Sequence, residues 1–404
     1  MGTELKRVAI LIETSTTWGA ELVAGVAEYA RQRGKWSMFV EPRGRHERLR
    51  LPRDWRGDGI IARVTHPLLA EDVKSSGLPA VNVSWIQLRD YAIPQVTADE
   101  IAVGKLAAQH FLDRGFRHFA YFGPDPRHGY EDRLGPTFAA AIASAGGACH
   151  VYQARRSSGS RVGWLAEIAD LIPWLRSLPK PAALLTWNDI RARQVTEACR
   201  ESGLSVPEDV AVLGGEYDAL NSEVSIPPLS SIDHNPRRVG YEAASVLESM
   251  MEGQEPPREP VLVPLRGVIQ RQSTNTLAID DRPLAEALQF IRMNLHRPIG
   301  VGDVVEATAL SRRLLEQRFQ KALGRSPAAE IRRVRIERAK QLLSDTRMSV
   351  AQVALASGFN FVEAMNVVFR REVGVTPTQY RRQTSASTLK HDALSQAKSL
   401  GVRG

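Results

Sequence analysis

The chain has 404 residues and a formal net charge of +8, with 43% hydrophobic and 24% charged residues; because single cores stop growing at roughly 250 to 300 residues, we expect two or three domains. No apolar run approaches the roughly 20 residues of a membrane helix, and the apolar run after Arg7 is too short for a secretory signal, whose core takes about 7 to 15 residues. Two cysteines and no Cys/His cluster at metal-ligand spacing indicate no disulfide framework, metal site or cofactor, and suit a reducing cytoplasm.

The first 281 residues alternate short β-rich runs with helix-period segments, the pattern of βαβ units around a parallel sheet. The predicted strands are residues 8–12, 37–40, 59–63, 80–83, 119–122, 182–185 and 210–213. The predicted helices are residues 20–33, 101–114, 136–145, 190–202 and 237–251. Glycine follows most of these helices, and because glycine adopts a left-handed backbone without steric penalty, we expect that conformation at Gly34, Gly115, Gly146 and Gly203.

Aromatic and polar residues follow several predicted strands at their carboxyl ends, where open α/β sheets bind ligands. A single tryptophan is more often plain core packing, and Asp189 at a helix start also suits an N-cap. The recurrence of such residues at strand ends favours a sugar site, because aromatic rings cover the C–H face of a pyranose while carboxylates and amides bind its hydroxyls. The candidate residues are Trp18, Trp85, Trp187, Asn188, Asp189 and Glu216.

From residue 282 onward the β pattern ends and helical periodicity takes over, so a domain boundary is predicted after residue 281. Residues 282–384 hold 18 Lys and Arg against 9 Asp and Glu. A basic segment on a near-neutral remainder is typical of a nucleic-acid-binding module, and a solvated basic face is the alternative. Residues 385–404 are polar and are predicted to form a mobile tail.

Two segments of the basic region share one layout: a short helix, a turn and a second helix with an apolar stripe. The stripes consist of Leu315, Phe319 and Leu323, and of Met365, Phe369 and Val373. Both segments are helix-turn-helix candidates, although a helical domain whose stripes only face its own core has the same pattern. One long helix over residues 327–344 separates them and would hold two reading helices at a fixed spacing, as successive major-groove faces of DNA require.

The face opposite each stripe is available to enter the major groove of DNA. Arginine pairs with guanine, glutamine and asparagine with adenine, glutamate with cytosine, and valine contacts the thymine methyl group. The predicted base-reading residues are Arg313, Glu316, Gln317, Glu363 and Asn366, with Val362 and Val367 beside the last two. The predicted phosphate contacts are Arg312, Arg370 and Arg371, and Arg332, Arg333, Arg338 and Lys340 are also available.

Several motifs of this quarter carry a family resemblance. They are Ser311 to Phe319, Leu323-Gly-Arg-Ser-Pro327, Arg335 to Leu343, Ser357-Gly-Phe359 and Phe369 to Pro377. Together they resemble the AraC-type DNA-binding domain over about a hundred residues. The resemblance implies an all-α domain with two helix-turn-helix units. It implies base contacts most firmly in the first unit, because Ala364-Met365 departs from the larger aromatic pair that is usual in the second.

Residues 6–273 carry a second resemblance, through Val96-Thr-Ala-Asp99, Phe119 to Gly123, Arg133-Leu-Gly135, Asn188-Asp189 and Gly203 to Val212. They are similar to the sugar-binding domain of LacI/GalR-type repressors and periplasmic sugar-binding proteins. This resemblance implies two lobes with parallel sheets and a hinge that closes on the ligand. It also implies effector contacts at Arg133, Asp189 and Glu216, with Trp18 in the first loop; Glu216 replaces the more usual aspartate.

A LacI-type sensor followed by an AraC-type reader resembles the family of xylose-responsive activators. The resemblance implies a sugar-responsive transcription activator, homodimeric and acting with RNA polymerase on double-stranded DNA, with D-xylose as the leading effector and pentose-utilisation genes as targets. Another sugar or a purine is an alternative effector. A sugar-acting enzyme is less favoured, because no Gly-x-Ser-x-Gly elbow, P-loop, dinucleotide fingerprint or His-Glu-x-x-His motif occurs.

Overall fold

A computed structural model describes residues 5–33, 36–44, 47–86, 88, 91–124, 131–153, 163–276, 281–308, 310–346 and 348–384. The predicted mobile tail, residues 385–404, lies outside the described residues. The chain divides into two compact units, one formed by residues 1–110 and 117–276 and the other by residues 111–116 and 277–404. The sequence places the boundary after residue 281, close to this division.

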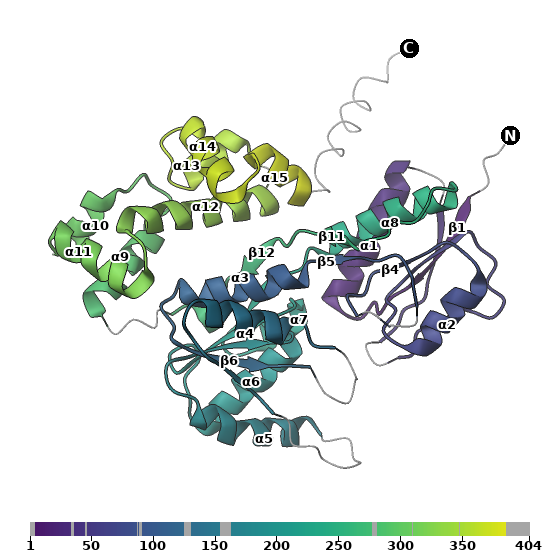
Figure 1. Ribbon diagram of the computed structural model, residues 1–404, viewed down its shortest axis with the longest axis horizontal. Helices are drawn as coiled ribbons and strands as arrows, with labels where there is room; N and C mark the ends of the chain where they lie inside the picture. Colours follow the sequence, from purple (N-terminus) through teal and green to yellow (C-terminus); the bar gives the residue numbers. More distant parts are fainter. Residues whose placement is uncertain are drawn as a thin grey trace, which may run out of the picture. The chain divides into compact units, whose positions relative to one another are not determined.

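The first unit contains two sheets, and we call the part built on each sheet a lobe. The N-terminal lobe has a parallel sheet in the order β2-β1-β3-β4 (Figure 1). Its strands are β1 (Lys6–Leu11), β2 (Trp36–Val40), β3 (Gly59–Ala62) and β4 (Ala80–Asn82), and its first helices are α1 (Thr17–Arg33) and α2 (Pro67–Ser76). The apolar runs become strands because a parallel sheet is covered on both faces. Every residue of β3 and β4 is buried, whereas β2 at one edge is only partly buried.

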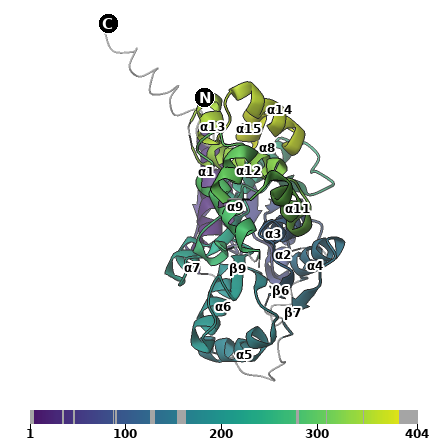
Figure 2. The same ribbon diagram turned by 90° about the vertical axis from the view of Figure 1, so that its left-hand side faces the viewer.

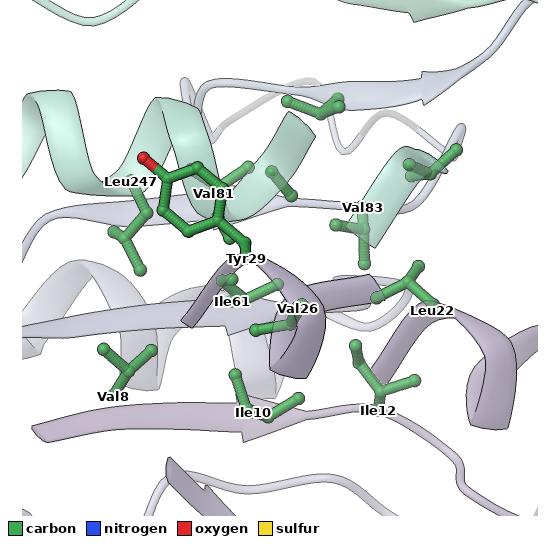
Figure 3. Close-up of a cluster of buried hydrophobic side chains, with 14 of the residues drawn as sticks. Val8, Ile10, Ile12, Leu22, Val26, Tyr29, Ile61, Val81, Val83 and Leu247 are labelled. Atoms are coloured by element: carbon green, nitrogen blue, oxygen red, sulfur yellow. The ribbon is translucent and has the colours of Figure 1, made fainter. Parts of the chain in front are cut away.

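One core of this lobe lies between the sheet and two helices, α1 and α8 (Pro236–Met251), and a second includes buried residues of α2. Figure 3 shows side chains from three strands meeting side chains from both helices; the labelled residues are Val8, Ile10, Ile12, Leu22, Val26, Tyr29, Ile61, Val81, Val83 and Leu247. Glycines allow α1 and α8 to approach closely. A Cβ at Gly25 would lie 1.9 Å from the carbonyl oxygen of Arg237, and a Cβ at Gly240 would lie 2.0 Å from that of Leu22.

The C-terminal lobe has a sheet in the order β12-β10-β9-β8-β6-β7, in which only β12 runs antiparallel to its neighbour. The strands are β6 (His118–Phe122), β7 (Cys149–Val151), β8 (Ala182–Thr186), β9 (Val210–Gly214), β10 (Ser230–Asp233) and β12 (Gly267–Ile269). Its helices are α4 (Leu134–Ser144), α5 (Trp164–Ser177), α6 (Asp189–Ser202) and α7 (Ala219–Val224). The pair α5 and α6 covers one buried core of this sheet.

The chain crosses between the lobes more than once. β5 (Val96–Ala98) pairs in parallel with β11 (Val261–Val263), and α3 (Glu100–Leu112) follows β5. After the strands of the second sheet, α8 returns to the N-terminal lobe, and β12 then joins the sheet of the C-terminal lobe. These crossings confirm the two-lobed α/β fold with parallel sheets that the resemblance implies.

The structure confirms the seven predicted strands and the five predicted helices of this unit, with small shifts at their ends. It also confirms a left-handed backbone at Gly115, Gly146 and Gly203, with φ of 78°, 80° and 75°, while Gly34 lies outside the described residues. The strands β5, β7, β10, β11 and β12 and the helices α2, α5 and α7 were not predicted. The missed strands are only three or four residues long, so partners distant in sequence decide them rather than a local pattern.

The second unit is helical and is organised along its longest helix, α12 (Pro327–Asp345). Its other helices are α9 (Arg282–Met293), α10 (Val301–Thr308), α11 (Arg312–Leu323), α13 (Val350–Ala356), α14 (Val362–Val373) and α15 (Pro377–Thr384). Figures 1 and 2 show α9 and α11 toward one end of α12 and α13 and α14 toward the other. Each end has its own core: Ile331 and Val334 pack with α9, α10 and α11, whereas Ala339 and Leu343 pack with α13 and α14.

Among the described helices, none combines the length and the low polarity that crossing a membrane requires.

We expect Gly25→Ala to lower the free energy of unfolding of the first unit by about 1 to 3 kcal/mol, because the added methyl group overpacks the contact with α8. Urea or thermal unfolding of the full chain measures the change. Gly302→Ala is the matched control: the added Cβ in α10 meets open space, so this variant is expected to be neutral or more stable by up to about 1 kcal/mol. Equal effects of the two substitutions would contradict the close-contact explanation.

Candidate ligand site and DNA-binding surface

In the N-terminal lobe, charged and aromatic side chains lie just after the strands. Glu13 follows β1 and is buried, with 8% of its surface exposed, and its carboxylate lies 3.5 Å from the guanidinium of Arg63, which follows β3. The same guanidinium stacks over the ring of Trp18, 4.7 Å from its centroid. Trp18 is buried at the start of α1, so this predicted ligand residue is one member of a packed Glu13–Arg63–Trp18 cluster.

In the C-terminal lobe, the predicted residues after β8 stand at the start of α6. The side chain of Asn188 is the N-cap and accepts a hydrogen bond from the backbone N–H of Arg191 at 3.1 Å. Asp189 is fully buried; Oδ2 accepts from the backbone N–H of Asp218 at 2.8 Å, and Oδ1 accepts from the hydroxyl of Ser231 at 2.6 Å. Asp189 therefore ties the loop after β9 to β10.

The pKa of Asp189 is raised to about 8, because burial of the charged carboxylate outweighs the two hydrogen bonds that it accepts. Glu216 and Asp218, in the loop after β9, add like charges that raise it further. Glu216 itself is partly exposed, and its backbone carbonyl accepts from the N–H of Asp189 at 3.2 Å. The interior of the C-terminal lobe thus holds a carboxyl group that takes up a proton near neutral pH.

The strand ends of the two lobes meet through an aromatic pair and a pair of hydrogen bonds. The rings of Trp85, after β4, and Trp187, after β8, are 4.4 Å apart between centroids and tilted by 48°. Elsewhere between the lobes the backbone N–H of Thr17 donates to Asp218 Oδ2 at 3.3 Å, and the Thr17 hydroxyl accepts from the N–H of Ala219 at 2.8 Å. The structure therefore brings two of the three predicted tryptophans into direct contact across the lobes.

Arg133 belongs to a charged group at the start of α4. Its side chain is 45% exposed and lies 3.5 Å from the carboxylate of Glu131. Burial raises the pKa of nearby Glu100 to about 8, although the positive charge of Arg133 acts in the opposite direction. Asp132 is held by the hydroxyl of Tyr121 and by a backbone N–H, at 3.0 Å each. Arg133 is thus a cation among carboxyl groups.

The prediction omitted three residues: Glu13 and Arg63, which form a cluster with Trp18 in the N-terminal lobe, and Asp218, which Thr17 contacts across the lobes. Glu13 directly follows a predicted strand and Arg63 is the last residue of another, so the strand-end signal that selected the tryptophans could have selected them. Asp218 follows its strand by four residues, and only the contact with Thr17 reveals its position. Among the described residues no group of His, Cys, Asp and Glu is arranged to hold a metal ion.

In the second unit, the two predicted helix-turn-helix segments are confirmed as α10–α11 and α13–α14. In α11, Leu315 and Phe319 are buried while Arg313 and Gln317 are exposed on the other side. Glu316 is also exposed, and its carboxylate lies 3.1 Å from Arg312. The predicted reading face of the first unit is therefore polar and open to solvent.

In α14, Met365 and Phe369 are buried, while the predicted base-reading residues Glu363 and Asn366 are exposed. Val367 lies beside them with 68% of its surface exposed. The predicted phosphate contacts Arg370 and Arg371 are exposed in the last turn of the same helix, where Arg371 pairs with Glu372 at 2.8 Å.

One residue named as available for phosphates is placed elsewhere. Arg333 is engaged by the fully buried carboxylate of Glu330 at 2.9 Å and by Asp113 at 2.5 Å, and Arg325 joins the same group. Asp113 belongs to the short segment 111–116 that groups with the helical unit. Because buried partners on two sides neutralise it, Arg333 is a structural residue and its assignment to phosphate is wrong.

Comparisons with known proteins agree with this geometry. A model of the XylR N-terminal domain matches residues 7–101, a model of the periplasmic binding protein-like domain matches residues 108–274, and a helix-turn-helix domain model matches residues 304–383. The xylose operon regulatory protein of Escherichia coli K12 is 28% identical over 387 residues, which are 94% of this chain and 98% of that protein. The protein of the same name from Haemophilus influenzae is 28% identical over 93% of this chain and 98% of its own length.

Solved structures give the same result. The structure of the xylose-binding transcription activator xylR matches with 26% identity and a TM-score of 0.59, covering 95% of this chain and all of that one. A LacI family regulator from Arthrobacter sp. FB24, in complex with lactose, matches 68% of this chain with 22% identity and a TM-score of 0.53, and shows the fold of the sensor alone. The chain is therefore a transcription regulator homologous to the xylose operon regulatory proteins, in which a periplasmic-binding-protein-like sensor precedes a helix-turn-helix DNA-binding domain.

Proposed function

We propose that this regulator binds D-xylose where its two lobes meet, and that the liganded form activates transcription of pentose-utilisation genes. In this proposal the chain works in the cytoplasm as a homodimer, contacts RNA polymerase on the DNA, and releases the sugar unchanged. The sugar assignment derives from the xylose-binding activator that the chain matches over 95% of its length. The contact of Trp85 with Trp187 is the observation in this chain that carries it.

Two tryptophan rings from opposite lobes together offer an aromatic surface against which a sugar can pack; we call this surface the aromatic wall. The C–H face of a pyranose packs against indole rings, and a site that combines one ring from each lobe is complete only when the lobes are together. The indole nitrogen of Trp85 is buried and has no hydrogen-bond partner in the structure. A sugar hydroxyl that accepts this N–H would satisfy it, since buried polar groups seldom remain unpaired.

The polar side chains of the predicted site and of the strand ends in both lobes suit hydroxyl groups. Glu216 and Asn188 come from the C-terminal lobe and Glu13 from the N-terminal lobe, and carboxylate and amide oxygens accept from hydroxyls. Arg63 and Arg133 supply donors. Asp189 stands behind the loop of Glu216 and Asp218, so we propose that it shapes the site from within and contacts the sugar only when that loop moves.

The regulatory step follows from the bonds that join the lobes. Thr17 bonds Asp218 and Ala219, so a ligand that stabilises this arrangement favours the closed form of the sensor. If closure changes the affinity for DNA, DNA must change the affinity for sugar by the same factor. Calorimetry with D-xylose, ribose, glucose and hypoxanthine tests the effector, and the absence of heat with any pentose would remove D-xylose from the proposal.

We expect Trp187→Ala to weaken D-xylose binding by at least about tenfold, because the sugar loses one ring of the aromatic wall. The measurement is calorimetric titration of the full chain. Trp164→Ala is the matched control: Trp164 lies at the start of α5, bonded to Glu197 at 2.9 Å, and its loss is expected to leave the affinity unchanged. Similar losses in both variants would point to general destabilisation instead of a contact.

Asp189 gives the sensor a specific pH dependence. Since its pKa is about 8 when folded and roughly 4 when unfolded, the stability from the protonated carboxyl is full below about pH 4 and is lost as the pH rises toward 8. We expect Asp189→Asn to remove this part of the fall in melting temperature between pH 5 and pH 8.5, because the amide accepts from Asp218 and donates to Ser231 at any pH. An identical pH profile in wild type and variant would show that Asp189 is ionised in the folded chain.

For DNA, we expect Arg313→Ala to cost about 1 to 3 kcal/mol on a specific site and to relax the preference at one base pair, since a bidentate contact to a base is lost. Arg371→Ala is expected to weaken binding to specific and to random DNA equally. It is also expected to reduce the slope of log binding constant against log salt concentration by about one. Quantitative binding assays on both kinds of duplex at several salt concentrations separate the two roles. A uniform loss for Arg313→Ala would contradict base reading by this residue.

A further inference from the structure

The second helices of the two helix-turn-helix units, α11 and α14, correspond residue by residue with an offset of fifty positions. The buried Leu315 and Phe319 of α11 correspond to Met365 and Phe369 of α14, and the left-handed Gly324 corresponds to Gly374. The second helix spans twelve residues in both units. Because the scaffold is the same, differences on the exposed side of the two helices report differences in what they read.

The two helices differ at the N-cap position. Ser311 caps α11, its side chain accepting from the backbone N–H of Leu314 at 3.3 Å. At the corresponding position of α14 stands Phe361, which makes no side-chain capping bond and has 68% of its surface exposed. Helix α14 therefore lacks a stabilising N-cap hydrogen bond, and the aromatic ring of Phe361 is exposed to water. When a local rule is broken without gain to the fold, a functional reason is expected.

Phe361 does not stand alone on this side of α14. Ala364 and Val367 follow at spacings of three residues, and both are exposed, Val367 to 68%. Residues three apart are neighbours on a helix surface, so the three side chains form a row, which we call the apolar row. In α11 the corresponding positions are Ser311, Leu314 and Gln317.

We propose that the apolar row reads the 5-methyl groups of thymines in the half of the DNA site that the second unit contacts. The thymine methyl is the apolar group that the major groove presents, and small apolar side chains recognise it. Contact with valine and phenylalanine removes both partners from water, which stabilises the complex. The first unit, with Arg313, Glu316 and Gln317, would read its half by hydrogen bonds. This inference rests on the DNA-binding role proposed above.

The surroundings of the row favour DNA over a protein partner. Asn366 is exposed next to Val367 in the sequence and offers both a donor and an acceptor to adenine, the base that pairs with thymine. Arg370 and Arg371, one turn further along, are exposed and suited to phosphates. Within the row, Val367 occupies the position that Gln317 has on the polar reading face of α11. Base-pair edges rich in A·T are therefore the occupant that fits its chemistry.

The test compares thymine with uracil, which pairs identically and lacks only the methyl group. Wild-type full chain, with D-xylose present, first selects duplexes from a random pool. Each thymine of a selected duplex is then replaced by deoxyuridine, and the dissociation constants are compared. We expect a loss of about fourfold for each methyl group that the row contacts, confined to one half of the site.

Three variants assign the effect to residues. Val367→Ala is expected to bring the ratio of the dissociation constants for the deoxyuridine and thymine duplexes close to one. Gln317→Ala, at the corresponding position of α11, is the matched control: it should weaken binding but retain the ratio. Phe361→Ser restores the cap found in the first unit, so it should keep or raise the melting temperature while lowering the affinity for the thymine duplex.

The outcomes separate this inference from the proposed function. If the wild-type chain selects no duplex above random, the DNA-binding role itself fails. If it selects a site, yet deoxyuridine binds as well as thymine at every position, the apolar row does not read methyl groups and the inference is overturned. An unchanged ratio of the two dissociation constants in both Val367→Ala and Phe361→Ser would also overturn it, because the methyl effect would then belong to other residues.

Discussion

The carboxyl ends of parallel strands lie at one edge of a sheet, and the sensor depends on this constraint. Glu13, Arg63 and Trp85 are far apart in sequence, yet each follows a parallel strand of the N-terminal lobe. Trp187, Asp189 and Glu216 do the same in the C-terminal lobe. Because the chain crosses between the sheets, the two edges are brought together, and Trp85 meets Trp187.

In the helical unit, α12 holds two similar helices, α11 and α14, at a fixed spacing. The two halves of α12 belong to two separate cores. Each core buries one side of a reading helix and leaves the other side in solvent. Since burial uses only the apolar stripe, the exposed positions are free to differ, and α11 and α14 have diverged there from polar to partly apolar.

Charges are placed according to whether they have partners. Arg333 and Glu330 are buried together with Arg325 and Asp113, so their cost of desolvation is offset inside the unit. Asp189 lacks a cation among its bonded partners, so burial raises its pKa instead. Arg313 and Arg371 remain at the surface, where cations keep their charge available for DNA. Burial thus separates the charges that stabilise the fold from those that we propose contact DNA.

Local periodic patterns in the amino-acid sequence were enough to predict the long elements, the change from α/β to helical structure and the two helix-turn-helix stripes. The sequence also marked the strand-end tryptophans, since a strand's end is visible in the chain. The short strands β5, β7, β10, β11 and β12 depended on pairing with distant segments. Residues far along the chain also decided that Thr17 contacts Asp218. In the same way, they decided that Arg333 belongs to a partly buried ionic cluster. Such features have no local signal, because their energy comes from partners that only the folded chain brings within reach.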